Sequence, residues 1–241
     1  MSSAHWYGVV DGDQVRGAVL IVPGRLCVPF IPDLSDARFI GAHLRREHRA
    51  CMTVGPREAS DGVWSSWAFD APVDRCHDQR LYVCDRAMPS PGLPEFRQAT
   101  VDDLDVLVPQ SAQMEFEDVG RRPYDEDPAG YTATIRRRVE AGQTWVTDHA
   151  GRIVFQINVG TATTWGAQVG GTYVPPDLRG KGLAAQGMAE LGKRLIPMHN
   201  RLTLHVHEAN TPAVRTYERT GYRPHAAFRL ITLRTPNMTH R

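Results

Sequence analysis

A short glycine-containing segment between a predicted strand and a predicted helix is the part of the sequence best suited to chemistry. A β-rich run ends at Val174, two prolines follow, and Arg179-Gly180-Lys181-Gly182-Leu183-Ala184 leads into a helix predicted over 182–196. The first amides of a helix lack acceptors within the helix, and the helix dipole adds partial positive charge there. Glycines let the backbone turn its amides toward one point. With the charges of Arg179 and Lys181, the segment predicts a pyrophosphate site.

Two common nucleotide motifs are absent from this segment. It contains neither the GxxxxGK[ST] of the nucleotide P-loop nor the GxGxxG of dinucleotide-binding folds. Taken alone, residues 179–184 also fit a helix entry with exposed basic side chains, and that alternative stays open.

The sequence that follows adds a second chemical segment. A predicted strand over 202–206 leads to Asn210, which begins a predicted helix over 211–220. Tyr217 stands seven residues after Asn210, and the helix ends in Tyr217-Glu218-Arg219-Thr220-Gly221-Tyr222. Pro212 supports a helix start here, because proline is favoured in the first turn.

These linked elements resemble the GNAT superfamily of acyl-CoA-dependent N-acyltransferases over about residues 96–235. Arg179, Gly182 and Ala184 fill that family's phosphate-loop pattern, [Q/R]-x-x-G-x-[G/A], and Val174-Pro175-Pro176 matches the strand before it. A looser resemblance, through 114–120 and the long N-terminal half, is to a GNAT subgroup whose first half is a domain of unknown function.

The resemblance implies a cofactor site. Backbone groups of Thr172, Tyr173 and Val174 would hydrogen-bond the pantetheine arm, and Asn210 would contact the arm or order the strand end. A plain helix N-cap is the alternative role for Asn210. The amides that would hold the pyrophosphate are those of Arg179, Gly180, Lys181, Gly182, Leu183 and Ala184.

Thioester aminolysis needs a base, an oxyanion contact and an acid for the leaving thiolate. The resemblance assigns the acid to Tyr217, with a packed core aromatic as the alternative, and a strand amide near Val174 could serve the oxyanion. His205 occupies the position at which some GNAT enzymes carry a glutamate base, and a structural histidine is its alternative. Other candidates for the base are His207, Glu115, Glu117 and water.

A proline-rich stretch divides the chain. Residues 88–95 predict a connector between an N-terminal α/β domain over 1–87 and a GNAT domain over 96–241. Predicted strands at 143–148, 152–159 and 167–174 precede a strand–helix–strand crossover, which indicates a mixed sheet of α/β (α+β) class. The N-terminal half is a candidate degenerate GNAT-like lobe. It has no matching phosphate loop, so we expect one acyl-CoA per chain.

Composition narrows the function classes. The 241 residues carry a net charge of +1, without the basic excess of a nucleic-acid binder. No apolar run is long enough to span a membrane, and the N-terminus has no secretory signal pattern, so we expect a cytoplasmic protein. Four cysteines without a CxxC pair predict reduced core thiols and no metal site.

The sequence therefore predicts an N-acetyltransferase that moves an acetyl group from acetyl-CoA to a primary amine by direct attack. The alternative is a non-catalytic acyl-CoA-binding or regulatory protein of the same fold. The expected acceptor is a small-molecule amine or a protein amine; no nucleic acid or membrane partner is expected, and homo-oligomerisation stays open.

Overall fold

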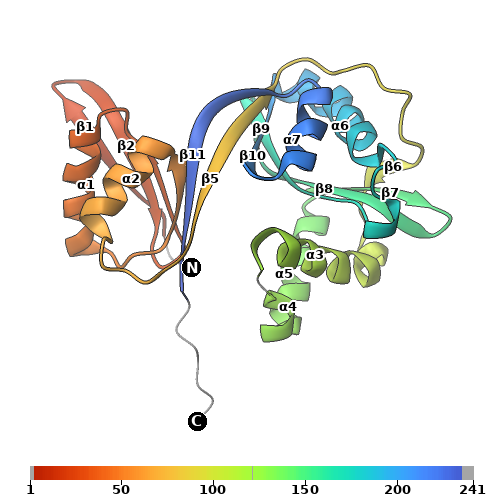
Figure 1. Cartoon of the computed structure of the whole chain (residues 1–241), viewed down its shortest axis with the longest axis horizontal. Helices are drawn as coiled ribbons and strands as arrows, with labels where there is room; N and C mark the ends of the chain where they lie inside the picture. The colour runs from red at the N-terminus through yellow and green to blue at the C-terminus, as the bar shows by residue number, and fades with distance from the viewer. Residues whose placement is uncertain (1–2, 121, 235–241) are drawn as a thin grey trace, which may run out of the picture. The chain divides into compact units, whose positions relative to one another are not determined.

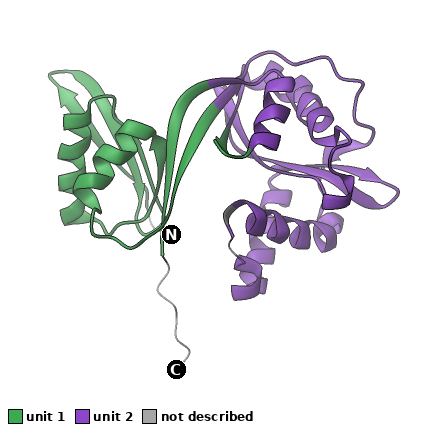
Figure 2. Ribbon diagram, in the orientation of Figure 1, with its two compact units in different colours: residues 1–81, 205–210, 225–241 green, residues 82–204, 211–224 purple. Residues whose placement is uncertain are grey.

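The computed structural model describes residues 3–120 and 122–234 and divides into two compact units (Figure 2). Unit 1 comprises residues 1–81, 205–210 and 225–241, and unit 2 comprises residues 82–204 and 211–224. The units are therefore discontinuous in sequence. The division at 88–95 stays a prediction about continuous domains.

Unit 1 is a twisted sheet with two helices packed against each other (Figure 1). Strands β1, β2 and β3 are antiparallel neighbours, β4 lies parallel to β3, and β11 lies antiparallel to β4. The elements are β1 (His5–Asp11), β2 (Gln14–Val22), β3 (Leu26–Phe30), α1 (Leu34–Glu47), β4 (Met52–Pro56), α2 (Arg57–Trp67) and the first part of β5 (Val73–Cys84).

Glycine permits the close packing of α1 on α2. A Cβ atom at Gly41 of α1 would overlap the carbonyl of Val63 in α2. Gly62 of α2 likewise faces Ala37 and Leu34 of α1 at 2.8 Å from an added Cβ. The sequence pattern counts Gly41 against a helix, because glycine lowers helix propensity; here the contact that it allows outweighs that cost.

The strands of unit 2 also pair in both parallel and antiparallel directions. Its strands run in the order β10, β9, β8, β7, β6, with β10 parallel to β9 and the remaining pairs antiparallel. The elements are β6 (Phe96–Gln98), a 3₁₀ turn (Val101–Asp103), α3 (Leu104–Val119), α4 (Pro123–Glu126), α5 (Pro128–Glu140), β7 (Thr144–His149), β8 (Arg152–Thr163), β9 (Gly166–Tyr173), a 3₁₀ turn (Pro176–Leu178), α6 (Leu183–His199), the first half of β10 (Leu202–His207) and α7 (Thr211–Arg219). Most of the last strand, β11 (Arg223–Leu233), belongs to unit 1.

Helices cover both faces of the unit 2 sheet (Figure 1). Neighbouring residues of β8 point to opposite faces, as the strand period requires. Phe155 packs so closely on α6 that a side chain at Gly187 would collide with its ring. Gln156, which is fully buried, donates to Ser111 of α3 on the other face at 3.3 Å.

The two halves of the chain repeat one order of elements. In the first half, three antiparallel strands are followed by α1, the parallel strand β4, α2 and β5; in the second half, β7–β9 are followed by α6, β10, α7 and β11. The final strands are exchanged, because β11 lies beside β4 and β5 lies beside β10. This repetition agrees with the expectation of a GNAT-like N-terminal lobe.

The sequence predicts most unit 2 elements to within a few residues, but it predicts a loop where the structure has α4. In the N-terminal half the residue pattern predicts strands at 15–22, 25–31, 50–54 and 80–84 and a helix at 34–48. Strand β1 and helix α2 are absent from this prediction, and β5 is much longer than 80–84. The predicted stop of a helix at Pro197 is wrong, because α6 continues to His199 with Pro197 inside its last turn. The residues Thr100-Val101-Asp102-Asp103, a polar residue followed by an acidic first turn, predict a helix start with Thr100 as its N-cap, and a reciprocal capping box with Asp103 confirms it.

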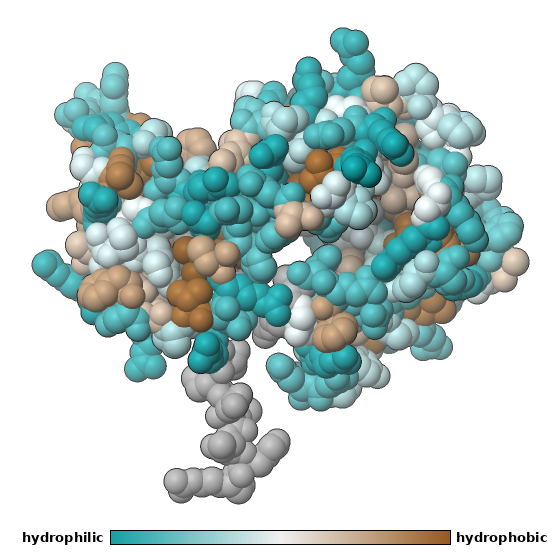
Figure 3. Space-filling view, in the orientation of Figure 1, coloured by the Kyte–Doolittle hydropathy of each residue, from teal (hydrophilic) through white to brown (hydrophobic). Residues whose placement is uncertain are grey.

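The surface is mostly hydrophilic with scattered apolar residues, on the face that Figure 3 shows. No helix among the described residues is long and apolar enough to cross a membrane. Nor do residues 3–120 and 122–234 contain a cluster of side chains able to hold a metal ion. Cys27, Cys51 and Cys84 are free and buried as expected, whereas Cys76 is exposed and so is not a core thiol.

Candidate functional site

The loop before α6 has the geometry of an anion cradle. Gly180 and Gly182 both adopt the left-handed conformation, at φ +78° and φ +81°. Gly182 occupies the N-cap position of α6, and no side chain caps the helix there. An added Cβ at Gly180 would meet no atom within 4 Å, so the loop backbone is open to an approaching group. The uncapped amides at the start of α6 fit an incoming phosphate.

Two arginines fix the loop. Arg152 of β8 forms a bidentate ion pair with Asp177, at 2.8 and 2.7 Å. Arg179 donates from Nε to the carbonyl of Val174 at 3.0 Å and from Nη2 to Glu117 of α3 at 2.6 Å. The Arg179 side chain thus binds the strand end and α3, while Lys181 is exposed and forms no ion pair with another described residue.

Strand β9 carries a bulge just before this loop. Its register against β8 pairs Tyr173 with Gln156 and Gly170 with Asn158, so β9 has one extra residue between the two pairs. Gly171 takes φ +60° at this point, and a side chain there would collide with the Asn158 amide. Bulges re-aim backbone groups, and this one lies beside Thr172.

Tyr217 of α7 lies against the bulged strand. Its side chain is partly buried, and its ring stands 6.0 Å from that of Tyr222. Burial raises the pKa of the Tyr217 hydroxyl above its ordinary value; a hydrogen bond with Thr172 opposes this rise and the charge of Asp118 adds to it. The structure therefore brings together Tyr217, Thr172 and the end of α3.

Three carboxylates at the end of α3 border this region. Glu117 is paired with Arg179, and Glu115 accepts a hydrogen bond from the Tyr131 hydroxyl at 3.1 Å. The Asp118 side chain is solvent-exposed, yet desolvation by the protein around it raises its pKa; the charges of Glu117 and Glu115 raise it further, and Arg179 opposes them. Sequence reasoning names the two glutamates and misses Asp118, whose significance depends on tertiary neighbours.

His205, His207 and Asn210 belong to unit 1. His205 and His207 share the half-buried face of β10, opposite Leu204 and Val206, as the strand pattern predicts. The His205 ring packs 4.6 Å from that of Phe228, and burial lowers the pKa of His205. The His207 ring stands 4.7 Å from that of His77. Asn210 is exposed and directly precedes the first residue of α7.

A cavity of about 310 Å³ opens beside the β9 bulge. Its polar lining comes from α3, α5 and the neighbouring strands, and the full lining is Met114, Glu115, Arg138, Gln143, Asn158, Val159, Gly160, Gln168, Val169, Gly170 and Gly171. We call it the β9 cavity.

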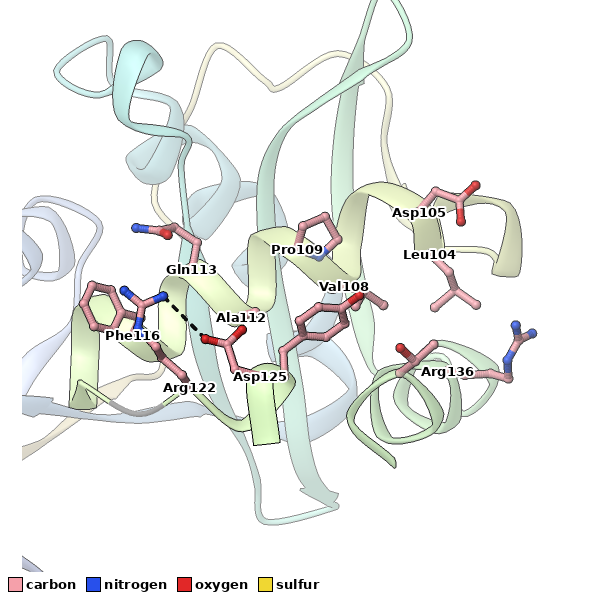
Figure 4. A pocket seen from close by; sticks show the side chains of 12 residues that line it. Leu104, Asp105, Val108, Pro109, Ala112, Gln113, Phe116, Arg122, Asp125 and Arg136 are labelled. Carbon is pink, nitrogen blue, oxygen red and sulfur yellow. Dashed lines mark ion pairs between the residues drawn. The ribbon is translucent and has the colours of Figure 1, made fainter. Parts of the chain in front are cut away.

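A different cavity, of about 440 Å³, lies between α3, α4 and α5 (Figure 4). Leu104, Val108 and Pro109 contribute to its apolar wall, and the ion pair of Arg122 with Asp125 stands at one end. No residue predicted from the sequence to be in the site lines this cavity.

The matching helix start in unit 1 is closed to anions. Asp33 caps α1 by accepting from the amides of Ser35 and Asp36, at 2.8 and 3.0 Å. Hydrogen bonds from the Ser35 side chain and the Asp36 amide lower the pKa of Asp33, which keeps it ionised. A carboxylate of the chain thus occupies the place that a phosphate would take.

Comparison with solved structures shows the same fold across both units. A GNAT-family acetyltransferase from Colwellia psychrerythraea matches with a TM-score of 0.60 and 11% identity, covering 95% of this chain and 85% of that one. A putative GNAT-family acetyltransferase from Novosphingobium aromaticivorans matches with a TM-score of 0.59 and 19% identity, covering 95% and 92%. A tandem GNAT protein from clavulanic acid biosynthesis matches with a TM-score of 0.54 and 15% identity, covering 98% and 84%.

A search of curated protein sequences finds no relative of this chain. However, the family model described as the acetyltransferase (GNAT) family matches residues 107–222. This range begins inside α3 and ends just after α7. That range contains the phosphate-loop candidate, the bulged strand and Tyr217. The chain therefore contains a region, residues 107–222, that matches the GNAT family of acetyltransferases, and its fold is similar to that of solved GNAT-family structures.

Proposed function

We propose that the protein transfers an acetyl group from acetyl-CoA to a primary amine, with no covalent enzyme intermediate. The observation that carries the proposal is the juxtaposition in unit 2 of an uncapped, glycine-opened helix start with a bulged strand end that contacts Tyr217. The first supplies donors for a pyrophosphate, and the second supplies donors where a thioester would lie.

The residues of the loop suit acyl-CoA as a substrate. The amides of 179–184 would hold the pyrophosphate, with Lys181 adding an unpaired charge among the described residues. Backbone groups of Thr172 and Tyr173 would hydrogen-bond the pantetheine arm. The Val174 carbonyl already accepts from Arg179, so we assign the arm to the other backbone groups of this strand end.

The proposed reaction balances in one transfer. The neutral amine nitrogen attacks the thioester carbonyl carbon, forms the C–N bond and gives one proton to a base. The C–S bond breaks, the thiolate takes the proton of the Tyr217 hydroxyl, and the proton held by the base restores that hydroxyl. The raised pKa of Tyr217 keeps that proton in place until the thiolate forms.

Asp118 is our candidate for the base, ahead of His205 and Glu117. It is a carboxylate close enough to Tyr217 for its charge to act on that hydroxyl, and its pKa is raised toward the range that suits a base. Glu117 is held by Arg179, and His205 belongs to unit 1, where its ring packs on Phe228.

Thiol release from acetyl-CoA in the presence of a panel of primary amines tests the proposal. We expect amine-dependent release with one thiol per amide formed. Tight acetyl-CoA binding without release for any amine would instead support the non-catalytic alternative. The proposal also includes a cytoplasmic location and an acceptor that is a small amine or a protein amine.

A further inference from the structure

The β9 cavity contains opposite charges on facing elements. Glu115 comes from α3 and Arg138 from the last turn of α5, and both side chains are half-buried. The polar groups of Gln143, Asn158 and Gln168 complete the lining, together with the backbone of Gly170 and Gly171. A cavity of about 310 Å³ has the size of a small-molecule site.

The charge of Arg138 has no partner among the described residues. Its guanidinium forms no hydrogen bond or ion pair with another residue of 3–120 or 122–234. Arg137, its neighbour in sequence, is exposed instead, and its guanidinium donates to the Thr134 hydroxyl at 2.9 Å. A half-buried guanidinium with five donors and no carboxylate partner is suited to binding an anionic group of a ligand.

Glu115 supplies the complementary charge. One of its oxygens accepts from Tyr131, which fixes the carboxylate at the cavity wall. Both charges act on the Tyr131 hydroxyl, because Glu115 raises its pKa and Arg138 lowers it. A ligand with one cationic and one anionic group would therefore find both partners in this cavity.

The β9 cavity also lies beside the proposed thioester position, where an acceptor amine would bind. Gly170 and Gly171, which line it, form part of the bulge that leads to Thr172 and the proposed thioester position. An amine held by Glu115 would enter from the α3 side of the strand. Its carboxylate would point away from the thioester, toward α5.

We propose that the acceptor is a small amine that also carries a carboxylate, the amino acid class, with its carboxylate bound by Arg138 and its ammonium by Glu115. This inference rests on the proposed acetyl transfer, because it names the acceptor of the same site.

The test compares acceptors that differ only in charge. Thiol release is measured for the L-amino acids and for the corresponding amino acid amides, which keep the amine and lose the carboxylate charge. We expect a higher kcat/KM for an acid than for its amide. The intrinsic reactivity favours the amide, whose amine has the lower pKa, so a preference for the acid reports recognition of the carboxylate.

Arg138→Gln and the matched control Arg137→Gln locate that recognition. Arg138→Gln should raise KM for the preferred amino acid about 10- to 100-fold, the size expected for one charge-assisted contact. Arg137→Gln should leave KM unchanged. The affinity for acetyl-CoA should be the same in all three proteins, which separates acceptor binding from loss of the fold.

Binding without turnover gives a second readout. Calorimetry of the CoA-loaded protein with the same amino acids should show binding that Arg138→Gln weakens and Arg137→Gln does not. Equal kcat/KM for acids and amides, or equal amino acid binding in the two variants, would overturn the inference and leave acetyl transfer standing. A protein that binds no acetyl-CoA would overturn the proposed function itself.

Discussion

The Tyr217 hydroxyl contacts Thr172 at the bulged end of β9, and its raised pKa means that it carries its proton at neutral pH. Tyr217→Phe keeps the ring and removes this donor. A positioned acid contributes about 100- to 10,000-fold in rate, so we expect kcat to fall by that order with little change in acetyl-CoA affinity. Steady-state kinetics of thiol release and calorimetry measure the two effects.

Tyr222 offers the matched control. It is buried, its ring lies 6.0 Å from that of Tyr217, and its hydroxyl has no hydrogen-bond partner among the described residues. Tyr222→Phe should therefore leave kcat unchanged. Full activity in Tyr217→Phe would show that water or the substrate supplies the proton.

The proposed role of Asp118 as the base predicts that kcat/KM depends on pH. A base acts only when deprotonated, and the raised pKa of Asp118 moves the acid limb of kcat/KM above the ordinary range of an aspartate near pH 4. Activity should fall as the pH drops through that raised pKa. In Asp118→Asn the limb should vanish and kcat should fall about 100-fold or more.

The control for this prediction is Glu117→Gln, which removes a neighbouring negative charge. Because Glu117 is among the causes of the raised pKa, its loss should move the acid limb to lower pH without removing it. An unchanged pH profile in Asp118→Asn would assign the base to another group.

At the scale of single elements, the N-cap positions of α6 and α1 differ. Gly182 at the start of α6 leaves the first amides of that helix free to bind an anion, whereas Asp33 at the start of α1 occupies them. Gly182→Val adds a side chain at φ +81° and displaces the first-turn amides. We expect acetyl-CoA affinity to fall about 10- to 100-fold, the size of one or two charge-assisted hydrogen bonds. Calorimetry of the variant measures the loss.

Gly24, in the turn between β2 and β3, provides a control position with a similar backbone conformation outside the proposed phosphate site. It has φ +71°, and an added Cβ there would meet nothing within 4 Å. Gly24→Val should lower stability by about 1–2 kcal/mol, like Gly182→Val, and leave acetyl-CoA affinity intact. If both variants bind equally well, the loop is not the phosphate site.

The sequence predicts those features that depend on residues close to one another in the chain. The Gly180 and Gly182 spacing, the Thr100 cap and the alternation of Leu204 and Val206 each depend on nearest neighbours, and the structure agrees with each. It does not reveal the β9 bulge, because Gly171 is required by the amide of Asn158 on another strand. Asp118 and Arg138 are missed for the same reason, since their environments come from packing between helices.

At the scale of the whole molecule, the exchange of final strands makes each unit depend on distant sequence. Tyr82 of β5 is fully buried in unit 2 and donates to Glu218 of α7 at 3.1 Å, and Cys84 is buried beside it. A fragment over 96–241 lacks both residues. Losing one buried aromatic removes about 2–3 kcal/mol of burial free energy, and the strand pairing of β5 is lost as well.

We therefore expect the 96–241 fragment to unfold without a cooperative transition in urea, followed by near-ultraviolet circular dichroism. A fragment over 73–241, which restores β5, should regain cooperative unfolding. A cooperative transition in the shorter fragment would support the continuous domain boundary predicted from the proline-rich stretch.

We predict a single acyl-CoA site in this protein, although the two halves of the chain repeat one order of elements. The start of α6 is open to an anion, whereas the Asp33 carboxylate closes the start of α1. Isothermal titration of the full chain with acetyl-CoA tests this prediction most directly. We predict saturable binding of one acetyl-CoA per chain; two acetyl-CoA molecules per chain, or no binding, would contradict the account.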